Sequence, residues 1–426
     1  MNHKNTVAVQ TLGCKLNQAE SEDLVHRLSR SGYQVVSASD HFDIFILNGC
    51  TVTGIADRKC RNLLRRACKR NPDALFVASG CYSRRSPCDM QSLDSGIVAH
   101  QGDSASLVEM LLARRPPATV DTERASCSPT PHRTRSFVKV QEGCEYHCTY
   151  CIVPIVRGEV ASVDISTVLA TIKLKVAEGY REIVLTGTNV GAYDSGNLRL
   201  SGLVGLVLEE TGAARLRLSS LQPVDVDSDL IAAFKDKRMC RHVHMPLQSG
   251  SGTVLPRMGR RYSLGGYRRA VCSLVEGIPE LAVSTDVIVG FPGETEAEHI
   301  ESLDFCRAMA YAAIHVFPYS PRPGTPAARL APVHGGTKKR RTDEFLELAS
   351  ESRRRFHSRF LCRRMEVLWE EKVKGSADTW SGLTDNYIRV HARSEPGINN
   401  AFLPVTLLED KGGWVKGKFE GYGTAA

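Results

Sequence analysis

Residues 143–151 read GCEYHCTYC and bring three cysteines into one short segment. Cys144, Cys148 and Cys151 have the spacing C-x3-C-x2-C. Thiolates are the usual ligands of iron–sulfur clusters, so this spacing predicts a cubane cluster whose fourth iron has no ligand from the segment. Such an open metal position is typical of a catalytic site. A zinc site is the alternative, and it would need a fourth ligand, for which His147 is the nearby candidate.

Three further cysteines each follow a predicted strand in the first part of the chain. These strands alternate with helical patterns, which predicts a parallel sheet with helices on its faces. Ligands bind beside the carboxyl ends of strands in open α/β sheets, so we expect the three cysteines to converge on one point. The strands and the cysteines that follow them are 7–13 with Cys14, 43–49 with Cys50, and 74–80 with Cys81.

The helices between these strands carry further signals. The first helix is expected to begin at Asn17 with acidic residues in its first turn, and to end at Gly32. The second helix spans 54–70 and carries basic residues on one face. We favour binding of a phosphate backbone by this face over a bland solvated surface. Its basic residues are Arg58, Arg61, Arg65 and Lys69.

The chain has 14 cysteines but begins without the apolar core and cleavage site of a signal peptide. Disulfide scaffolds are typical of exported proteins, so metal binding and buried thiols are the better interpretations. Cys60 and Cys68 in the second helix, and Cys88 in a loop, are predicted to be packing or incidental thiols. No run of about 18 uncharged apolar residues occurs. We therefore expect a cytoplasmic protein without a membrane span.

The net charge of +8 is unevenly distributed. Residues 365–426 hold 7 Lys and Arg against 9 Asp and Glu, so this part is −2 and residues 1–364 carry +10. A polyanionic partner such as nucleic acid suits the larger part. A surface charge that serves only solubility is the alternative.

The chain is predicted to be an α/β protein of several parts. From Ser136, six strand patterns recur with helical patterns between them, which fits a partial (β/α)6 barrel better than a full eight-unit barrel. The last part has short strands and turns, which predicts a small antiparallel β-barrel. The predicted parts are an N-terminal parallel-sheet domain at 1–115, a Pro-rich linker at 116–134 that includes Cys127, the barrel at 135–328, a basic helical connector at 329–364 and the β-barrel at 365–426.

Polar and glycine-rich segments follow several strands of the predicted barrel, at the ends where chemistry takes place in βα barrels. They read LTGTN, PLQSGS and DVIVGFPGET, and glycine permits a close approach of backbone to a ligand. Together they are expected to surround a cofactor. His242 and His244 alternate on the fourth strand and are predicted to be packed or hydrogen-bonded, with metal ligation as the alternative.

The cysteine triplet, with Tyr150 before its last cysteine, resembles the cluster loop of radical S-adenosylmethionine (SAM) enzymes. TLGCKLNQ, NGCTVTGIADRKCR and ASGCYSRR resemble the three cysteine motifs of the methylthiotransferase N-terminal domain. RSFVKVQEGCEYHCTYCIVPIVRG, LTGTNVGAY, RLSSLQP, HVHMPLQSGS and TDVIVGFPGETE resemble the radical SAM core of that family. The resemblance covers residues 7–328, with Gly49 where the family usually has Thr or Ser, and the final part resembles an RNA-binding TRAM barrel.

The resemblance implies SAM and two [4Fe–4S] clusters as cofactors. In that family the open iron of the first cluster chelates SAM, and reduction cleaves SAM to a 5′-deoxyadenosyl radical. The triplet would hold this cluster, and Cys14, Cys50 and Cys81 would hold a second cluster that relays or donates sulfur. The residues expected to contact SAM are Tyr150, Gly187, Asn189, Ser220, Gln248 and Asp286.

TLGCKxNQ, CTVT and ADRK resemble the branch of this family that acts on N6-threonylcarbamoyladenosine in tRNA. The implied reaction replaces the hydrogen on C2 of this nucleoside, at position 37 beside the anticodon, with a methylthio group. The alternatives are N6-isopentenyladenosine in tRNA, an aspartate of a ribosomal protein, a non-enzymatic iron–sulfur sensor or RNA-binding module, and an intact fold without activity. The implied partners are tRNA and a flavodoxin- or ferredoxin-type reductant, and a monomer is favoured.

Overall fold

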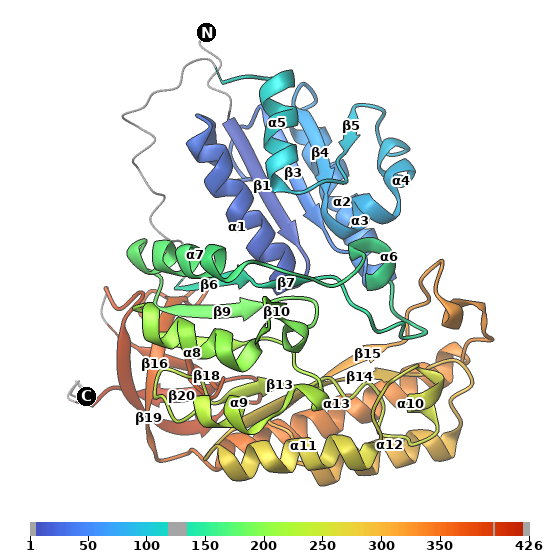
Figure 1. The fold of residues 1–426 in the computed structure, drawn as a ribbon, viewed down its shortest axis with the longest axis vertical. Helices are drawn as coiled ribbons and strands as arrows, with labels where there is room; N and C mark the ends of the chain where they lie inside the picture. Colours follow the sequence, from blue (N-terminus) through green and yellow to red (C-terminus); the bar gives the residue numbers. More distant parts are fainter. Residues whose placement is uncertain (1–5, 118–133, 395–396, 421–426) are drawn as a thin grey trace.

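The computed structural model describes residues 6–117, 134–394 and 397–420, which form three packed parts (Figure 1). A parallel sheet with helices stands at the top of the view, a curved parallel sheet occupies the middle, and a small β-barrel lies at the lower left. The predicted linker at 116–134 falls almost entirely outside the described residues, and so does Cys127.

The N-terminal sheet has five parallel strands in the order β2-β1-β3-β4-β5. Its two faces are covered by separate apolar cores, one with α1 and α5 and the other with α2. Strands β1, β3 and β4 confirm the three strands predicted from the sequence. Strands β2 and β5 were not predicted, because each is too short to show a hydrophobic pattern. The bounds are β1 Thr6–Leu12, α1 Lys15–Arg30, β2 Gln34–Val36, β3 Ile44–Gly49, α2 Gly54–Arg70, β4 Leu75–Ser79, α3 Gly80–Arg85, α4 Pro87–Gln91, β5 Ile97–Ala99 and α5 Ser104–Arg114.

Two local expectations in this sheet are wrong. Helix α1 begins at Lys15 rather than Asn17 and has no acidic residue in its first turn. Asn17 is buried, and its side chain donates to the side-chain oxygen of Asn48 at 2.9 Å, so a tertiary contact fixes the first turn. Cys88 lies in α4 rather than in a loop, because Pro87 stands at the first position, where its fixed φ favours a helix.

The central part is an open barrel of parallel strands in the order β6-β9-β12-β13-β14-β15. Parallel bridges from Leu216 to Met239 and from Ser220 to His244 join its two halves. This confirms the partial (β/α)6 barrel. The strands are β6 Arg135–Lys139, β9 Glu182–Thr186, β12 Arg215–Leu218, β13 His242–His244, β14 Ala282–Val289 and β15 Ala313–Pro318, and the main helices are α7 Ile165–Ala177, α8 Leu200–Glu210, α9 Ser228–Ala233, α11 Leu264–Gly277, α12 Glu296–Met309 and α13 Gly335–Ser358.

Several short elements decorate the central barrel. They are β7 Gln141–Glu142, α6 Val153–Arg157, β8 Ala161–Ser162, β10 Asp194–Ser195, β11 Leu198–Arg199 and α10 Val254–Arg257.

Helix α13 occupies most of the segment predicted as a connector. It packs against β15 and contributes Phe345, Leu348 and Ala349 to the main apolar core of the central barrel. The segment is therefore helical, as expected, but it also forms the outer layer over the last strand. The charged runs at 338–341 and 353–355 concealed this role, because they lie beside apolar residues that recur at helical spacing.

The C-terminal part is a closed five-stranded barrel in the order β16-β17-β18-β20-β19. The prediction of a small β-barrel is confirmed, but the expectation that all its strands are antiparallel is wrong, because β18 and β20 pair in parallel. The long strand β19 crosses the barrel and pairs antiparallel with β16. Strand β20 then pairs antiparallel with β19 and so runs in the same direction as β18. The bounds are β16 Arg364–Lys372, β17 Thr379–Thr384, β18 Arg389–Arg393, β19 Phe402–Asp410 and β20 Val415–Lys418.

The C-terminal barrel packs against the amino ends of the central strands, which we call the floor of the central barrel. Arg215, the first residue of β12, donates to the backbone oxygen of Leu383 at 3.2 Å and pairs with Glu366 at 3.0 Å. Arg135, the first residue of β6, pairs with Glu370 at 2.5 Å. In Figure 1 the arrow of β9 points away from the C-terminal barrel. The floor is therefore at the opposite end from the cysteine triplet.

A fully buried ion pair lies just above the floor. The guanidinium of Arg217 on β12 donates to both carboxylate oxygens of Glu182 on β9, at 2.7 and 3.1 Å. Both side chains are completely inaccessible to solvent. Burial alone would raise the pKa of Glu182, but the charge of Arg217 outweighs it and lowers the pKa to about 2. Removal of one partner from such a pair leaves an uncompensated buried charge, which is costly.

We expect Glu182→Gln to lower the free energy of unfolding by about 3–5 kcal/mol, because Arg217 keeps its charge and loses its carboxylate. Glu366→Gln is the matched control, since that carboxylate is 60% exposed in its pair with Arg215, and its loss is expected to cost about 1 kcal/mol or less. Urea unfolding followed by circular dichroism measures both. Equal effects of the two substitutions would contradict the prediction.

Candidate functional site

Cys14, Cys50 and Cys81, which we call the strand-end triad, lie where neighbouring strands finish. Cys14 follows β1, Cys50 follows β3, and Cys81 is the second residue of α3, directly after β4. Strand β3 pairs with both β1 and β4, so the three carboxyl ends are adjacent. Cys50 and Cys81 are buried and Cys14 is exposed, and all three are free thiols. The structure thus brings together cysteines that are far apart in the sequence.

The protonation of these thiols follows from their surroundings. Burial raises the pKa of Cys50 to about 12; the backbone N–H of Val52, 3.4 Å from its sulfur, opposes this, and the charges of Cys14 and Cys81 reinforce it. Burial also raises the pKa of Cys81, against the lowering effect of Arg157. A buried thiol of this kind loses its proton readily only when a metal takes its place. The triad therefore fits metal ligands better than free nucleophiles.

The volume beside Gly49 explains why this position has no side chain. A Cβ atom on Gly49 would stand 3.0 Å from the sulfur of Cys60 and 3.4 Å from the Cβ of Tyr82. Cys60 is fully buried in the core between α2 and the sheet, as predicted for a packing thiol. Its S–H points to the backbone oxygen of Cys50 at 3.6 Å. Cys60 thus fills the space that a larger residue at position 49 would use.

Cys144, Cys148 and Cys151, which we call the cluster triplet, lie in a loop after β6 and β7 that is held at several points. Gly143 has a φ of +74°, and a Cβ there would stand 1.7 Å from the backbone oxygen of Glu159, so only glycine fits. The backbone N–H of Thr149 donates to the oxygen of Met258 at 2.9 Å. Burial raises the pKa of Cys151 to about 12.

An arginine contacts a sulfur of the cluster triplet. The guanidinium of Arg260 lies 3.5 Å from the sulfur of Cys148 and also donates to the side-chain oxygen of Gln222. Cation–π contact with Tyr262 at 4.7 Å fixes it further. A cation at this distance stabilises the negative charge of a thiolate. This residue was not predictable from the local sequence, because it follows α10, 109 residues or more after the triplet it serves.

A second arginine links the two groups of cysteines. Arg157, at the end of α6, donates to the sulfur of Cys81 at 3.1 Å. Glu20 and Glu142 hold its guanidinium at 2.7 and 2.9 Å. Burial alone would lower the pKa of Arg157, but the charges of Cys81 and Glu20 outweigh it and raise the pKa.

The same contact region shows that the two groups of cysteines are neighbours. Cys81 forms one apolar cluster with Ile152 and Val156, and Ile152 directly follows Cys151. Cys81 of the strand-end triad therefore lies beside the end of the cluster triplet, where the N-terminal sheet meets the central barrel. In Figure 1, α6 lies between these two parts of the molecule, close to α3.

A buried carboxylate fixes the N-terminal sheet to the central barrel. Asp57 in α2 accepts from Thr51 at 2.6 Å, from Arg85 at 2.9 Å and from Arg322 at 2.6 Å. Arg322 lies in the segment YSPRPGT that follows β15, and its side chain is 4% exposed. Nearby, the backbone N–H of Gly54 donates to the hydroxyl of Ser320 at 3.0 Å. The cysteine loops of the two parts are thus held in a fixed relation.

Polar atoms at the carboxyl ends of β9 and β12 fit a bound cofactor. Among the described residues, the buried side-chain oxygens of Thr188, Asn189 and Ser219 have no hydrogen-bond partner. Buried polar atoms normally have partners, so a ligand at this end of the barrel is expected to supply them. A Cβ on Gly187 would stand 2.8 Å from the side-chain oxygen of Gln141, so glycine keeps this turn close to the barrel.

The other residues expected to contact SAM lie around the same end. The backbone of Ser220 forms an isolated β-bridge with that of His244. Gln248 has a φ of +71°, and its backbone forms an isolated β-bridge with Val287 on β14. Asp286 lies 3.3 Å from His244. Tyr150 packs against an apolar cluster, and burial raises its pKa well above the usual value. The assignment of these residues to SAM remains a proposal.

The two histidines of β13 are hydrogen-bonded, as predicted. His242 and His244 both contact the hydroxyl of Ser284, at 3.0 and 2.9 Å. Ligand atoms of His244, Asp286 and His315 all lie within 4.8 Å of one another, so these side chains face the same space inside the barrel.

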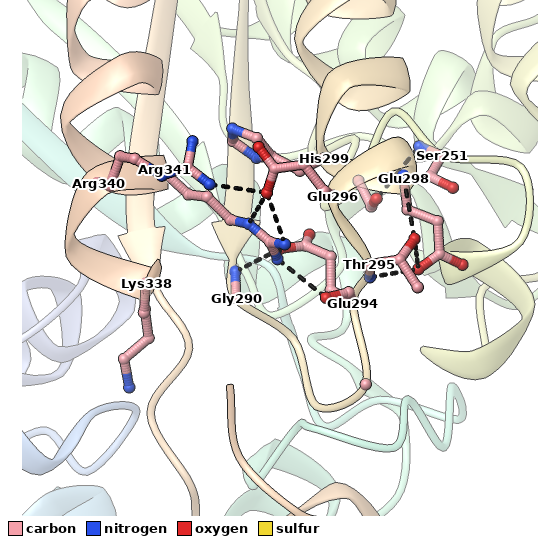
Figure 2. Close-up of polar contacts among 12 residues, drawn as sticks. Ser251, Gly290, Glu294, Thr295, Glu296, Glu298, His299, Lys338, Arg340 and Arg341 are labelled. Atoms are coloured by element: carbon pink, nitrogen blue, oxygen red, sulfur yellow. Dashed lines mark hydrogen bonds and ion pairs between the residues drawn. The ribbon is translucent and has the colours of Figure 1, made fainter. Parts of the chain in front are cut away.

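Figure 2 shows how the glycine-rich loop after β14 is secured by α13. Arg341 donates to the carboxylate of Glu294 at 2.8 Å and to its backbone oxygen at 2.9 Å. The same carboxylate accepts from the backbone N–H of Gly290 at 3.0 Å. Thr295 and Glu298 form a capping box at the start of α12. The loop that faces the cofactor end is therefore anchored by the helix that was predicted to be only a connector.

The predicted basic face of α2 is mostly available to a partner. Arg58, Arg65 and Lys69 are exposed, and the described residues provide no ion-pair partner for these three. Arg61 is partly buried and donates to the hydroxyl of Tyr82 at 2.7 Å, so it also supports the fold. This face begins close to Cys50. A phosphate-binding surface beside the site is therefore a proposal that the exposed cations support.

Comparisons with known proteins match this architecture. Residues 6–100 match the profile of the "Uncharacterized protein family UPF0004", and residues 138–306 match that of the "Radical SAM superfamily". The chain is 33% identical to the threonylcarbamoyladenosine tRNA methylthiotransferase MtaB of Bacillus subtilis (strain 168), over 97% of this chain and 96% of that protein. It belongs to the radical SAM methylthiotransferase family. MtaB of Thermotoga maritima is 34% identical over 90% of each chain.

A second kind of relative also matches. The tRNA-2-methylthio-N(6)-dimethylallyladenosine synthase of Desulfosudis oleivorans is 35% identical over 88% of this chain and 87% of that protein. Among solved structures, the radical SAM methyltransferase TsrM from Kitasatospora setae has a TM-score of 0.56 at 14% identity, covering 76% of this chain and 77% of that chain. The radical SAM enzyme OxsB has a TM-score of 0.51 at 12% identity, covering 82% and 56%. These two structures support the fold.

Membership of this family sets the cofactors. Radical SAM methylthiotransferases use SAM and [4Fe–4S] clusters, and this protein is an enzyme of that class. The free thiols of both cysteine groups fit the clusters, and the unpaired polar atoms at the barrel mouth fit SAM. Within the described residues, no helix has the length and apolar character needed to span a membrane.

We expect alkylation of the metal-free, reduced chain at pH 8 to modify Cys14 and Cys88 before Cys50. Cys14 and Cys88 are exposed, whereas burial raises the pKa of Cys50 to about 12, so only about one Cys50 in ten thousand is a thiolate at that pH. Mass spectrometry of peptides taken over time gives the order. Labelling of Cys50 as fast as Cys88 would show that the strand-end triad is not preformed.

Proposed function

We propose that this protein adds a methylthio group to C2 of N6-threonylcarbamoyladenosine at position 37 of tRNA. The observation that carries the proposal is that the strand-end triad lies beside the cluster triplet, through the contacts of Cys81 with Ile152 and α6. A C–H thiolation needs a radical source and a sulfur source at one substrate atom, and two adjacent groups of thiolate ligands meet that need. The identity to MtaB of Bacillus subtilis points to the nucleoside.

The cofactors, when bound, supply the one-electron chemistry that breaks an unactivated C–H bond, together with the sulfur and the methyl group. In the proposal, the cluster triplet would hold the cluster that binds SAM, and the strand-end triad would hold the second cluster. Arg260 and Arg157 donate to ligand sulfurs and stabilise their negative charge.

The remaining residues position SAM and exclude water. Asn189, with Gly187 beside it, lines the mouth at the end of β9, and Ser220 does so at the end of β12. Gln248 and Asp286 approach from β13 and β14, and Tyr150 packs behind the triplet. The C-terminal barrel covers the floor, so solvent does not enter from that side.

A second candidate substrate is N6-isopentenyladenosine in tRNA. It is favoured by the 35% identity to a tRNA-2-methylthio-N(6)-dimethylallyladenosine synthase, which is as high as the identity to MtaB proteins. That match covers 88% of this chain, whereas the match to MtaB of Bacillus subtilis covers 97%. The motif TLGCKLNQ adds to the case for threonylcarbamoyladenosine. An aspartate of a ribosomal protein is a third outcome of the test below.

We further propose that the basic face of α2 contacts the tRNA backbone, with Arg58, Arg65 and Lys69 as its exposed cations. The carboxylates of the C-terminal barrel are directed in part at floor arginines, so this part is proposed to cover the floor more than to bind RNA. A flavodoxin- or ferredoxin-type protein would supply electrons, and the enzyme would work in the cytoplasm as a monomer.

We expect the 2-methylthio form of threonylcarbamoyladenosine to appear when this chain is expressed in a host that lacks its own methylthiotransferases. Mass spectrometry of tRNA nucleosides, with and without the chain, measures the product. A methylthio-isopentenyl nucleoside in its place would move the chain to the second candidate. If neither nucleoside appears while iron analysis finds both clusters, the proposed substrate is wrong, and ribosomal proteins should then be searched for methylthio-aspartate.

We expect Cys148→Ala to abolish reductive SAM cleavage, and Cys50→Ala to retain SAM cleavage but abolish thiolation. The difference follows from their places in the cluster triplet and the strand-end triad. Chromatography of 5′-deoxyadenosine and mass spectrometry of the nucleoside measure the two steps separately. Cys88→Ala is the control, because this exposed thiol in α4 belongs to neither group. Retained thiolation in Cys50→Ala would refute the second-cluster assignment.

A further inference from the structure

The inside of the central barrel, which we call the lumen, contains one lysine from the N-terminal domain. Every second residue of a barrel strand packs into the outer apolar core, as Val243 does on β13 and Val287 on β14. The residues next to them on each strand therefore face the lumen. Lys15 reaches this space from the first position of α1, directly after Cys14. It is the residue next to a proposed cluster ligand, yet its side chain points to residues of the other two parts of the molecule.

The ammonium group of Lys15 lies near the ring of Tyr387. Tyr387 comes from the C-terminal barrel and stacks on His242 of β13, with ring centroids 4.4 Å apart. The guanidinium of Arg217 lies 4.6 Å from the Tyr387 ring, and that of Arg135 lies 6.0 Å from it. The ammonium of Lys15 is also 6.0 Å from this ring. Three cations from two domains therefore surround one aromatic ring of the third.

The charges at this place do not balance. Arg217 is paired with Glu182, and Arg135 with Glu370. For Lys15, no carboxylate lies within ion-pair distance in the part of the chain that the structure describes. The lumen beside Tyr387 thus has a surplus positive charge.

The pKa shifts of His242 and Tyr387 agree with a surplus of positive charge here. Burial lowers the pKa of His242, and the charges of Arg217 and Lys15 lower it further. Burial alone would raise the pKa of Tyr387, but the charges of Lys15, Arg135 and Arg217 outweigh it, and the pKa is lowered. Both shifts have the sign that a cationic environment produces.

The lumen is open to solvent above this place. Asp286 on β14 faces the lumen with its side chain 25% exposed. On β15, His315 is exposed and Phe317 is 42% exposed, although Ile314 beside them is buried in the outer core. These inward-facing side chains are therefore accessible to solvent.

We propose that Lys15 binds the carboxylate of an amino-acid substituent on N6 of the target adenine. This inference rests on the proposed function and deepens it, because the threonylcarbamoyl group carries such a carboxylate and the isopentenyl group does not. An unpaired ammonium in a cationic, partly enclosed space is complementary to an anion, and an apolar substituent would leave it unpaired. C2 and C6 flank N1 of the adenine ring, and C6 carries the substituted N6, so a fixed carboxylate would also orient C2 toward the neighbouring strand-end triad. Lys15 thus acts as a specificity-determining residue.

In a competing role, Lys15 would only offset the negative charge of a cluster held by Cys14. That role would affect all substrates equally, and it would change cluster content or reduction. Preference for a carboxylate is a different property, and it can be measured by binding alone.

The test compares binding of synthetic anticodon stem-loops to the chain with both clusters reconstituted. The stem-loops carry threonylcarbamoyladenosine, its neutral carboxamide analogue or plain adenosine at position 37. We expect the unmodified chain to prefer the acid over the carboxamide by about tenfold or more, as for hydrogen bonds to a charged group. Lys15→Gln is expected to lose this preference while keeping its affinity for the carboxamide, and Lys15→Arg to retain much of it. Lys235→Gln, which removes an exposed lysine near α9, is the matched control.

Two results would overturn the inference. In one, Lys15→Gln keeps the preference for the acid. In the other, it weakens all three stem-loops equally and lowers the iron content, which would assign Lys15 to the cluster.

A parallel assay of methylthio product separates this inference from the proposed function. If the unmodified chain thiolates the threonylcarbamoyl stem-loop and Lys15→Gln still discriminates, only the carboxylate site fails. If the unmodified chain thiolates an isopentenyl stem-loop instead, both fail.

Discussion

The arrangement of the site depends on Asp57, a carboxylate buried where the N-terminal sheet meets the central barrel. Two arginines from different parts of the chain, Arg85 and Arg322, converge on it. Buried charges persist only when they are fully paired, and loss of one partner typically costs about 3–5 kcal/mol. This requirement permits one docking of the two parts. In that docking Cys81, which follows β4, packs against Ile152, the residue after the cluster triplet, so the two groups of cysteines become neighbours.

The cysteines and the barrel could be predicted from the sequence because their signals are local. The spacing of the cluster triplet lies within one segment, and each member of the strand-end triad directly follows a strand whose apolar run is visible. Because ligands lie at the carboxyl ends of parallel strands, cysteines that are far apart in the sequence could be predicted to converge. The supporting arginines were not predictable in this way. Arg157 and Arg260 each contact a sulfur only because the fold brings distant segments together.

The wrong expectations also have physical causes. Helix α13 was expected to be a connector because its charged runs dominate the local composition, whereas its role is set by apolar residues such as Phe345 that meet strands formed earlier in the chain. The parallel pairing of β18 and β20 could not be predicted either, since it depends on β19 crossing the barrel between them. The net negative charge of the C-terminal part also has an explanation that composition does not reveal. Glu366, Glu370 and Asp385 meet arginines of the floor.

These floor contacts also bear on how the protein is made. Arg135 contacts a carboxylate that follows it by 235 residues, and Arg217 contacts a backbone oxygen 168 residues later. At a synthesis rate of about 5–20 residues per second, the floor arginines precede their partners by roughly ten to fifty seconds. During that interval the nascent central barrel carries exposed cations and an uncovered end while it is still attached to the ribosome. The last 60 or so residues therefore complete the barrel as an intramolecular cap, and premature release of the chain would leave a cationic opening that attracts nucleic acid without specificity.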